Sequence, residues 1–469
     1  MNKKIKNPNQ LLKSGDTESR RIVLEVTERI LQKLDAYPRI LSMMSVQGDM
    51  LTIGNRRWEL STKRHIYLIG AGKACNAMAR AVEESLGDWL TDGVAIVKIR
   101  EPADSALRRI RFYVGGHPLP NQSGLEASQK VLALIDTASQ DDLFICVMSG
   151  GSSALMSYPR EGISLQDEIN ATDVLLKSGA TIREINAIRR HISRMNGGQM
   201  AKRIADRGAE LIGFNISDSV SNPPTGDITV PWVDFQATPM GPDHTTLDDA
   251  KQVIRKYGLR NRLPESIISF FSRCTAADET PKAFPQNTYY QINTLPDSCV
   301  YGEQAAAELG LPCMVLTTFL DGEAKDTGSV MASMAREIQR YQRPIAPPCL
   351  VLSAGEMVTT IIDNSTIKGH GGPSQEMTLG FALQAAAAPG ACLLSIDSEG
   401  TDGTTDAAGG IADSASGAAA AAAGVDMVAA LRDHASYESL RSMNSLVMTG
   451  NTGTNICDIN VMFVPALNE

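Results

Sequence analysis

The sequence predicts an α/β protein of two domains, the first of which contains a doubly wound, Rossmann-like parallel sheet. Short apolar runs, of the kind that form strands buried on both faces, alternate along the chain with segments of helical periodicity. Several of these runs end in loops rich in glycine and hydroxyl residues. At 469 residues the chain is also longer than a single hydrophobic core usually supports, which favours two domains.

The clearest strand covers residues 143–148 and ends in the loop Ser149, Gly150, Gly151, Ser152 and Ser153. Glycines allow backbone N–H groups to approach an anion, and the hydroxyls add donors that suit phosphate or carboxylate oxygens. Ligands of open α/β sheets bind at the carboxyl ends of strands. The loop therefore indicates an anion site, although an ordinary strand-to-helix turn is the alternative.

The segments before this strand predict a tail, a helical region and further strands. Residues 1–17 are rich in Lys and Asn and predict a disordered tail, and residues 18–46 repeat apolar positions at helical spacing. Further strands are expected over 65–69, 93–99 and 111–114, with a helix over 125–135. The resulting order, β-α-β-β-α-β, is typical of a doubly wound sheet.

A second glycine loop, which contains Gly70, Gly72 and Lys73, follows the strand at 65–69. It lacks the third glycine of a dinucleotide fingerprint, because Cys75 stands there, and the first glycine of a Walker A loop, because Leu68 stands there. Lys73 nevertheless lies at a predicted helix N-terminus, where its ammonium group and the helix dipole both attract an anion. A solvated lysine is the alternative interpretation.

A basic helix follows further along the chain. Thr181 and Glu184 form a capping box that predicts its start, and the helix carries Arg189 and Arg190. Arg190 and Arg194 are one turn apart on one face, with Arg183 on a neighbouring face. These arginines belong either to a solvated basic face or to a clamp for an anion.

The last strand of the first domain is expected over 210–216. Asp218 follows it and is well placed as a general base or a metal ligand. The Pro-rich stretch 221–245 predicts a long functional loop. A polar region without periodicity comes near residue 280, so we expect the two domains to cover 18–275 and 286–469.

The second half repeats the alternation of strands and helices. Strands are expected over 289–293, 313–317, 349–353 and 391–396, with helices over 298–309, 326–341 and 415–424. Residues 354–356, which include Glu356, and residues 357–362 are expected to form a hairpin. Acids and glycines converge in the loop that contains Thr401, Asp402, Gly403 and Asp406. These acids either hold Mg²⁺ or belong to a solvated surface.

Composition excludes several classes of partner. The formal net charge is −9, and residues 389–469 contain ten Asp and Glu against two Arg, which argues against nucleic acid. Apolar stretches long enough to span a membrane and a secretory signal are both missing from the sequence, so we expect a soluble cytoplasmic protein. The eight cysteines are scattered singly and predict reduced core residues.

Taken together, these loops resemble the class II glycerate kinases, a two-domain family whose C-terminal half is called the MOFRL domain and which genomes often label hydroxypyruvate reductase. The resemblance spans residues 66–463 and rests on these stretches in order: Gly70-Ala-Gly-Lys-Ala74, Gly116-His-Pro-Leu-Pro120, Ser149-Gly-Gly-Ser-Ser-Ala-Leu155, Ser178-Gly-Ala180, Glu184-Ile-Asn186, Ser217-Asp218, Glu399-Gly-Thr-Asp-Gly403, Thr405-Asp-Ala407 and Thr452-Gly-Thr-Asn455.

The resemblance implies an ATP- and Mg²⁺-dependent kinase that phosphorylates the 2-hydroxyl of D-glycerate, or of a related polyhydroxy acid, in a cleft between a Rossmann-like domain and a MOFRL-type domain. Lys73 and Asp218 match family positions that act directly. Nucleotide or phosphate binding is then expected at the loops of Gly70, Gly72 and 149–153, and at Glu356, Thr401, Asp402 and Gly403. Substrate binding is expected at Arg189, Arg190, His370 and Gln375, and metal binding at Asp218, Asp402 and Asp406. A homodimer is possible.

The chain departs from the family pattern at cationic positions. Asn196 and Gln199 flank a glycine pair where the family carries Lys and Arg, and Pro373 stands where an arginine is usual. The departures leave open which hydroxy acid is the substrate. Two alternatives are a silent homologue that binds a nucleotide or acid without turnover, and an NAD(P)-dependent hydroxypyruvate reductase. The reductase is disfavoured because the third glycine is missing and Lys98 follows Val97 where an acid would bind ribose.

Overall fold

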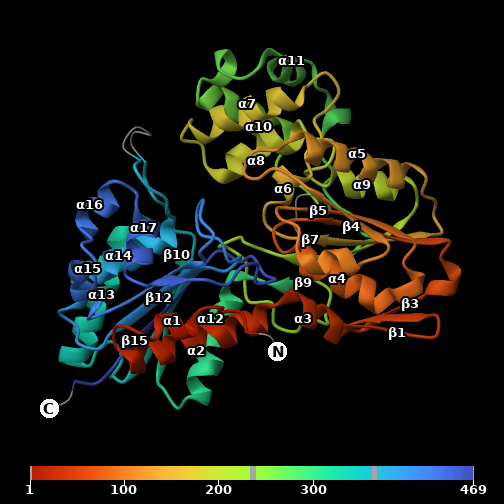
Figure 1. Ribbon diagram of the computed structural model, residues 1–469. Coiled ribbons are helices and arrows are strands. Elements are labelled where there is room, and N and C mark those ends of the chain that lie inside the picture. Colours follow the sequence, from red (N-terminus) through yellow and green to blue (C-terminus); the bar gives the residue numbers. More distant parts are fainter. Residues whose placement is uncertain (1–2, 233–238, 362–366, 468–469) are drawn as a thin grey trace. The chain divides into compact units, whose positions relative to one another are not determined.

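The computed structural model describes residues 3–232, 239–361 and 367–467. The chain divides into two compact units, each with a six-stranded sheet (Figure 1). We call residues 36–216 and 226–292 the parallel-sheet unit, and residues 1–35, 217–225 and 293–469 the mixed-sheet unit. These units differ from the expected domains 18–275 and 286–469, because the segments 18–35 and 217–225 join the C-terminal half of the chain.

The parallel-sheet unit contains the doubly wound sheet that the sequence predicts. Its strands lie in the order β6-β5-β4-β7-β8-β9, and the neighbouring pairs from β6 to β8 are parallel. The strands are β4 (His65–Ala71), β5 (Asp92–Val97), β6 (Ile110–Val114), β7 (Asp142–Met148), β8 (Glu210–Ile216) and β9 (Thr288–Asn293). The run at 289–293 was expected to open the second domain's sheet, but β9 lies at the edge of this one.

Helices cover both faces of the parallel sheet. Helices α5 (Gln122–Asp136) and α9 (Gln199–Asp206) pack on one face, and α4 (Cys75–Leu86) packs on the other (Figure 1). Alternate residues of the central strands, such as Tyr67, Ile69 and Ala71, join the core beneath α5 and α9, because side chains alternate between the two faces of a strand. Helix α3 (Ala36–Met43) packs against α4. A small antiparallel sheet of β1 (Met44–Gln47), β2 (Met50–Ile53) and β3 (Arg56–Glu59) follows α3.

A helical subdomain with its own core belongs to the same unit. It consists of α7 (Leu165–Leu176), α8 (Ile182–His191), α10 (Leu247–Lys256) and α11 (Glu265–Arg273). The capping box is confirmed, since the Thr181 hydroxyl accepts from the Glu184 N–H and the Glu184 carboxylate accepts from the Thr181 N–H. At the other end of α8, His191 is fully buried between the Ala187 carbonyl at 2.6 Å and Glu279 Oε1 at 2.7 Å.

The mixed-sheet unit has strand order β10-β11-β15-β12-β13-β14. β10 and β11 are parallel, whereas β15 is antiparallel to β11 and β12, and β13 is antiparallel to β12 and β14. The strands are β10 (Cys313–Leu320), β11 (Cys349–Gly355), β12 (Cys392–Asp397), β13 (Gly409–Asp413), β14 (Leu446–Val447) and β15 (Asp458–Val464). The hairpin expected over 357–362 is not formed by residues 357–361, which make one isolated bridge, Glu323 to Val358; Ile362 lies outside the described residues.

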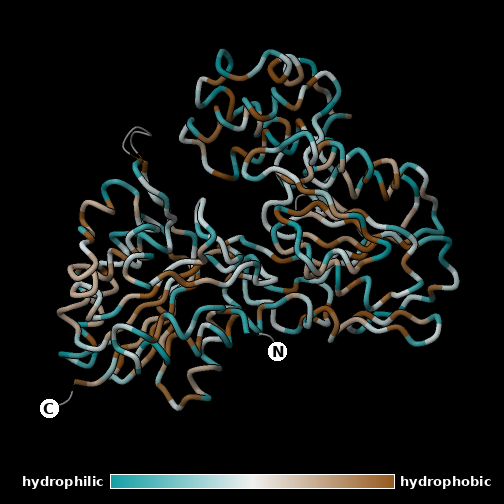
Figure 2. Tube along the Cα trace, viewed as in Figure 1, coloured by the Kyte–Doolittle hydropathy of each residue, from teal (hydrophilic) through white to brown (hydrophobic). Residues whose placement is uncertain are grey.

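Two layers of helices flank this sheet. Helices α2 (Thr17–Leu34) and α12 (Leu295–Glu308) pack together against it, and so do α13 (Ala324–Tyr341) and α14 (Pro373–Ala385). Gly328 and Gly380 let α13 and α14 approach closely, because a Cβ at either position would lie 2.0 Å from a carbonyl oxygen of the other helix. Helices α15 (Ser416–Ala422), α16 (Met427–Arg432) and α17 (Ser436–Ser442) contact α14. The strands of both sheets are among the brown, hydrophobic traces in Figure 2.

The N-terminal segment is part of the mixed-sheet unit, where the sequence predicted a disordered tail. It contains the short helix α1 (Pro8–Leu11), and Ile5 and Leu11 are buried. The Lys6 N–H donates to the Met448 carbonyl at 2.8 Å. Its few apolar side chains fill sites on the C-terminal half of the chain, which a local reading of a Lys- and Asn-rich segment does not reveal.

A buried ion pair holds α2 in this unit. Arg20 Nε lies 2.5 Å from Asp413 Oδ2, and both side chains are almost fully buried. The Asp413 carboxylate also accepts from the backbone N–H groups of Asp16 and Ala415. Nothing in the described part of the chain has the length and hydrophobicity of a membrane-spanning helix.

We expect Arg20→Ala to lower the free energy of unfolding by about 3–5 kcal/mol, because it leaves the Asp413 charge buried without its cation. Urea unfolding followed by circular dichroism measures the loss. The neighbouring Arg21→Ala is the matched control, since Arg21 forms an exposed pair with Glu18 that contributes at most about 1 kcal/mol. Equal losses in the two variants would contradict the structural role of the buried pair.

Glu279 gives the helical subdomain a dependence on pH. Burial alone would raise the pKa of Glu279, but hydrogen bonds from the Leu247 N–H, His191 and Lys282 outweigh burial and lower the pKa to about 2. The unfolded value is about 4.3. The stabilisation from Glu279 is therefore complete above pH ~4.3 and is lost as the pH falls towards 2.

Glu279→Gln is expected to reduce stability at pH 7 and to make the loss of stability between pH ~4.5 and 3 less steep than in the wild type. Unfolding in urea at several pH values tests both effects. Glu161→Gln, which changes an exposed acid of the same unit, serves as the control and should leave the slope unchanged. If the free energy of unfolding fell equally steeply with pH in Glu279→Gln and in the wild type, Glu279 would not be the source of this pH dependence.

Candidate functional site

The two glycine loops predicted from the sequence lie together at the centre of the parallel sheet. One follows β4 and the other follows β7, and these strands are neighbours in the middle of the order β6-β5-β4-β7-β8-β9. From β4 the chain adds β5 and β6 on one side of the sheet and then β7, β8 and β9 on the other, so the topological switch point lies between β4 and β7. Ligands of doubly wound sheets bind in the crevice at such a switch point, beyond the carboxyl ends of the strands.

Backbone hydrogen bonds join the two loops. The Lys73 N–H donates to the Gly150 carbonyl at 3.0 Å, and the Ser149 N–H donates to the Ala71 carbonyl at 3.1 Å. The Ala74 N–H donates to the Ser149 hydroxyl at 3.0 Å. Lys73 is therefore fixed beside the Ser149–Gly151 turn, immediately before α4.

The glycines at this contact have defined steric roles. Gly72 has φ +135°, and a Cβ there would lie 2.1 Å from Ser149 Oγ. Gly151 has φ +86°, and a Cβ there would lie 3.2 Å from Lys73 Cγ and 3.0 Å from His117 Cδ2. Gly70 backs the turn, since its Cβ would meet Cys75 Sγ at 2.5 Å. Only glycine fits these positions without moving a neighbour.

His117 is a site residue that the sequence reasoning missed. It comes from the loop after β6 and lies against Gly151, beside Lys73. The stretch Gly116-His-Pro-Leu-Pro120 was singled out as a motif, and this was the available signal. It carried no role because sequence spacing does not show that the loop after β6 reaches the loop after β7.

Asn196 contacts the end of this loop at Ser153. Its Nδ2 donates to the Ser153 carbonyl at 3.1 Å, and the side chain is almost fully buried. Ser152 begins the short helix α6 (Ser152–Leu155), and its N–H donates to the Ser149 carbonyl. Asn196 thus supports the site loop from behind with a neutral side chain.

The two arginines of α8 have internal acidic partners. Arg190 Nη1 donates to Asp243 Oδ1 at 2.8 Å, and the Asp243 side chain is fully buried. Arg189 interacts electrostatically with Glu168, and burial lowers the pKa of Arg189 and raises that of Glu168. This differs from the solvated basic face that the sequence left open, because both side chains are partly buried and interact with acids of the same unit.

A second group of predicted residues lies in the mixed-sheet unit. Asp397 ends β12 and Asp458 begins β15, and they are direct partners across this antiparallel pair. Asp402 lies at the N-terminus of α14, where its carboxylate accepts from the Ser374 N–H at 3.3 Å and the Gln375 N–H at 2.8 Å. The Ser374 hydroxyl donates to Asp458 Oδ1 at 3.1 Å. Residues at the N-terminus of α14 therefore donate hydrogen bonds to two of the three acids, Asp402 and Asp458.

Burial and mutual repulsion perturb these carboxyl groups. Burial raises the pKa of Asp402 to about 8, and the neighbouring charge of Asp397 adds to the rise. Burial raises the pKa of Asp458 well above its usual range, and Asp397 and Asp402 both contribute. A cation at this place would relieve the repulsion, since an opposite charge favours the ionised forms.

Asp218 and Glu356 lie near the same acids. The Cys457 thiol donates to the Asp218 carbonyl at 3.2 Å. The pKa of Cys457 is raised well above its usual range by burial and by the charges of Asp218, Glu356 and Asp397. Although Asp218 follows a strand of the parallel sheet, residues 217–225 belong to the mixed-sheet unit.

The remaining predicted residues of this unit are divided between the interior and the surface. The Gln375 side chain is buried and donates to Thr405 Oγ1 at 2.9 Å. The Thr401 hydroxyl donates to Glu399 Oε1 at 2.6 Å. Gly403 packs on Gly371, whose carbonyl oxygen would lie 2.1 Å from a Cβ at residue 403.

Two exposed side chains, His370 and Asp406, are bonded to α17. His370 Nδ1 lies 2.7 Å from Glu438 Oε1, and Asp406 Oδ1 accepts from the Tyr437 hydroxyl at 2.8 Å. Pro373 occupies the first turn of α14, where its missing N–H and fixed φ are well tolerated.

The predicted Mg²⁺ ligands lie among these acids only in part. Within residues 3–232, 239–361 and 367–467, no three His, Cys, Asp or Glu side chains converge into a ready-made metal site. Mg²⁺ usually takes one or two carboxylates together with substrate phosphates and water. The repelling pair Asp397 and Asp402 fits that partial donor set, and Asp218 lies with Asp397 near Cys457. Asp406 instead accepts a hydrogen bond from Tyr437.

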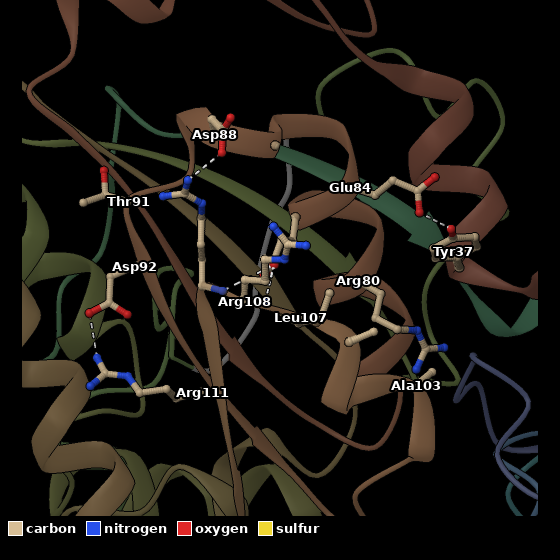
Figure 3. A pocket seen from close by; sticks show the side chains of 14 residues that line it. Tyr37, Arg80, Glu84, Asp88, Thr91, Asp92, Ala103, Leu107, Arg108 and Arg111 are labelled. Carbon is tan, nitrogen blue, oxygen red and sulfur yellow. Dashed lines mark hydrogen bonds and ion pairs between the residues drawn. The ribbon is translucent and has the colours of Figure 1, made fainter.

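A surface pocket of about 990 Å³ lies elsewhere on the parallel-sheet unit (Figure 3). Its lining includes Asp92, at the amino end of β5, and so it lies away from the carboxyl ends that carry the loops. Arg111 donates to Asp92 at 2.6 Å and Arg109 donates to Asp88 at 2.7 Å. Its charged walls are largely paired with each other, so we do not assign the predicted site to it.

Comparison with known families gives matches over most of the chain. Residues 22–272 match the family described as "Domain of unknown function (DUF4147)", and residues 349–458 match the MOFRL family. A glycerate 2-kinase from Pyrococcus horikoshii is 36% identical over 451 residues, with 95% of this chain and 97% of the relative covered. A D-glycerate 2-kinase from Thermotoga maritima is 33% identical and covers 84% of this chain and 89% of the relative.

A solved structure matches as well. The crystal structure of a glycerate kinase (EC 2.7.1.31) from Thermotoga maritima superposes with a TM-score of 0.75 at 29% identity, and the match covers 95% of this chain and 99% of that one. The chain therefore shares its overall fold with that kinase.

We expect Gly72→Ala to destabilise the protein more than Gly48→Ala. Both glycines have positive φ, but a Cβ at Gly72 meets the Ser149 side chain and backbone, whereas at Gly48 nothing lies within 4 Å. Gly48→Ala should therefore lower the free energy of unfolding only by the backbone strain that it introduces, about 1–2 kcal/mol. Urea unfolding measures both losses, and similar values would show that the contact between the two loops is not tight.

Proposed function

Because this chain belongs to the glycerate kinase family of phosphotransferases, we propose that it transfers the γ-phosphoryl group of ATP to the 2-hydroxyl of D-glycerate or a closely related hydroxy acid. The single observation that carries the proposal is Lys73, fixed by backbone hydrogen bonds beside Gly150 and Gly151 at the switch point of a doubly wound sheet. We also propose that the protein is cytoplasmic, where ATP and Mg²⁺ are available to it.

We assign phosphate binding to the two glycine loops. Phosphoryl transfer depends on positioning and on neutralising charge, because the protein performs little covalent chemistry itself. Lys73 supplies a cation directly before the N-terminus of α4, where the helix dipole also favours an anion. The turn from Ser149 to Ser153 supplies glycine backbone and hydroxyl groups at the adjacent strand end. His117, which lies against Gly151, adds a second titratable group.

The proposal assigns Mg²⁺ to the acids of the mixed-sheet unit. Asp402 and Asp218 would hold it, with Asp397 beside them, and Glu356, Thr401 and Gly403 would lie around the nucleotide. Bound Mg²⁺ supplies charge neutralisation for the phosphates. Asp402 supports this assignment because its raised pKa reflects burial next to another carboxylate. Asp406 fits less well, since its carboxylate accepts from Tyr437.

Asp218 has a further role in the proposal as the general base. A hydroxyl that attacks a phosphorus atom must lose its proton, and a half-buried carboxylate just past a strand end can accept it. In kinases an aspartate commonly accepts the proton of the substrate hydroxyl.

Substrate contacts are proposed for Arg189, Arg190, His370 and Gln375. The arginines are held by Glu168 and Asp243, so their positions are fixed before any ligand arrives. Fixed donors lose less entropy on binding a carboxylate than mobile ones. With the neutral side chains of Asn196, Gln199 and Pro373 at family cation positions, we propose that the chain prefers an acid larger than D-glycerate, by about 1–2 kcal/mol for each missing charge-assisted hydrogen bond.

The reductase alternative finds little support at β5. That strand ends at Val97 and is followed by Lys98, where a dinucleotide-binding sheet carries an acid for the ribose. The first acid after it, Glu101, accepts from Arg80 at 2.5 Å. A nicotinamide cofactor would therefore meet a lysine at this strand end.

An assay of ADP release with Mg²⁺ and ATP tests the proposal across D-glycerate, L-glycerate, tetronates and pentonates. Phosphorus NMR then identifies the phosphorylated carbon. We expect acid-dependent ADP release and a 2-phosphorylated product, with kcat/KM ranking the acids. Calorimetric ATP binding without any product would identify a silent homologue, and hydroxypyruvate-dependent oxidation of NAD(P)H would identify a reductase.

Lys73→Ala should lower kcat by about 10²-fold or more while the fold is retained, since a preorganised charge-stabilising donor is lost. Steady-state kinetics and circular dichroism measure the two properties. Lys130→Ala is the control, because Lys130 is exposed on α5 of the same unit. Turnover near the wild-type rate in Lys73→Ala would remove this lysine from the mechanism.

For Asp218→Asn we expect a loss of kcat of about 10²–10⁴-fold with a smaller change in nucleotide affinity, as for the loss of a general base. Titration with ATP in the presence of Mg²⁺ gives the affinity. An equal loss of turnover and affinity would assign Asp218 to the metal instead.

A further inference from the structure

Asp218 lies in a loop without regular secondary structure. Residues 217–225 follow β8 and form neither a helix nor a strand. A general base must stay within hydrogen-bond reach of the proton that it accepts. The loop therefore needs contacts that keep Asp218 in place, and residues 293–297 and Cys457 of the same unit supply them.

The first two residues of the loop are held through their backbone. The Ser217 N–H donates to the Asn293 carbonyl at 3.0 Å, and the Cys457 thiol donates to the Asp218 carbonyl at 3.2 Å. Within the loop, Asn222 Nδ2 donates to the Ser217 hydroxyl at 2.7 Å. These bonds fix the backbone immediately before and after the Asp218 Cα atom.

The far end of the loop is held by the N-terminus of α12. The Thr225 N–H donates to Asp297 Oδ1 at 3.0 Å, and the Thr294 hydroxyl donates to the Pro223 carbonyl at 2.8 Å. Asp297, Thr294 and Thr225 are buried. Because a buried N–H without an acceptor is costly, the position of Thr225 depends on the Asp297 carboxylate.

Thr294 and Asp297 also form the capping box of α12, and a second box of the same composition shows what capping alone requires. Asp297 Oδ2 accepts from the Thr294 N–H at 2.8 Å, and in α10 Asp249 Oδ2 accepts from the Thr246 N–H at 2.8 Å. The Asp249 side chain is exposed, whereas Asp297 is buried and uses its other oxygen for Thr225. A helix cap needs neither the burial nor the second oxygen, so Asp297 has a task besides capping.

We propose that Asp297 is a positioning residue for Asp218. It binds Thr225 while Thr294 holds Pro223, so that α12, which packs against α2 and the mixed sheet, supports the loop that carries the base. This inference rests on the proposed function, in which Asp218 accepts the proton of the substrate hydroxyl. A displacement of ~1 Å in a reacting group can lower the rate by about 10²-fold.

Asp297→Ala should lower kcat by about 10-fold or more and change the KM for ATP by less than about 3-fold, because the loop of the base moves. Asp249→Ala is the matched control, since it removes the carboxylate from the same position of the capping box of α10. The control also loses a helix cap but should keep the wild-type kcat. Equal losses of kcat in the two variants would make Asp297 a capping residue only and would overturn the proposal.

Thr294→Val and Thr294→Ser are a second pair of variants, which serves if Asp297→Ala does not fold. Valine keeps the shape of threonine but removes the donor to the Pro223 carbonyl, whereas serine keeps the hydroxyl. We expect kcat to fall by about 3–10-fold in Thr294→Val, the equivalent of one hydrogen bond, and to be restored in Thr294→Ser. The same kcat in both variants would contradict the role of this hydroxyl.

Hydrogen exchange of the peptide covering 217–225 measures the order of the loop independently of activity. Exchange should be faster in Asp297→Ala and Thr294→Val than in the wild type and Asp249→Ala. Unchanged exchange would overturn the proposal, and so would faster exchange with a wild-type kcat in a protein that Asp218→Asn inactivates. An active Asp218→Asn variant would instead refute the assignment of the base, and the positioning role would fall with it.

Discussion

The contact between the loop after β4 and the loop after β7 is the constraint on which the parallel-sheet site depends. Gly72 leaves no room for a side chain beside Ser149. The Lys73 N–H donates to the Gly150 carbonyl and the Ser149 N–H donates to the Ala71 carbonyl, so that backbone hydrogen bonds join the two loops. Because β4 and β7 are central neighbours in the sheet, the register of the whole sheet sets the distance between these loops. Helices on both faces of the sheet then protect that register by burying the strands.

Much of this arrangement could be predicted from local sequence. Buried strands such as β7 and β8 are marked by uninterrupted apolar runs, and α8 is marked by its capping box. The periodicity of a strand does not reveal its direction or its sheet, however. For this reason β9 was assigned to the wrong sheet and the antiparallel β15 at the centre of the second sheet was not foreseen.

The candidate site was predictable where one loop carries it, and not where distant loops meet. The loops of Lys73 and Ser149 were each visible alone as glycine-rich strand ends. His117 reaches Gly151 from a third loop, and Asp402 is bound by the N-terminus of α14. Asp458 was not singled out because a single acid at the start of an apolar run has no local signal, and its partner Asp397 lies across a pairing of distant strands.

The interleaving of the two units along the chain has a consequence for biosynthesis. The mixed-sheet unit takes residues 1–35 and 217–225 as well as 293–469, so the chain passes between the units at residues 35, 216, 225 and 292. Helix α2 is synthesised long before Asp413, which neutralises Arg20. The parallel-sheet unit can therefore fold while the protein is still being made, whereas α2 must wait with its apolar face uncovered. A gene divided near residue 290 would separate α2 from the sheet that it covers.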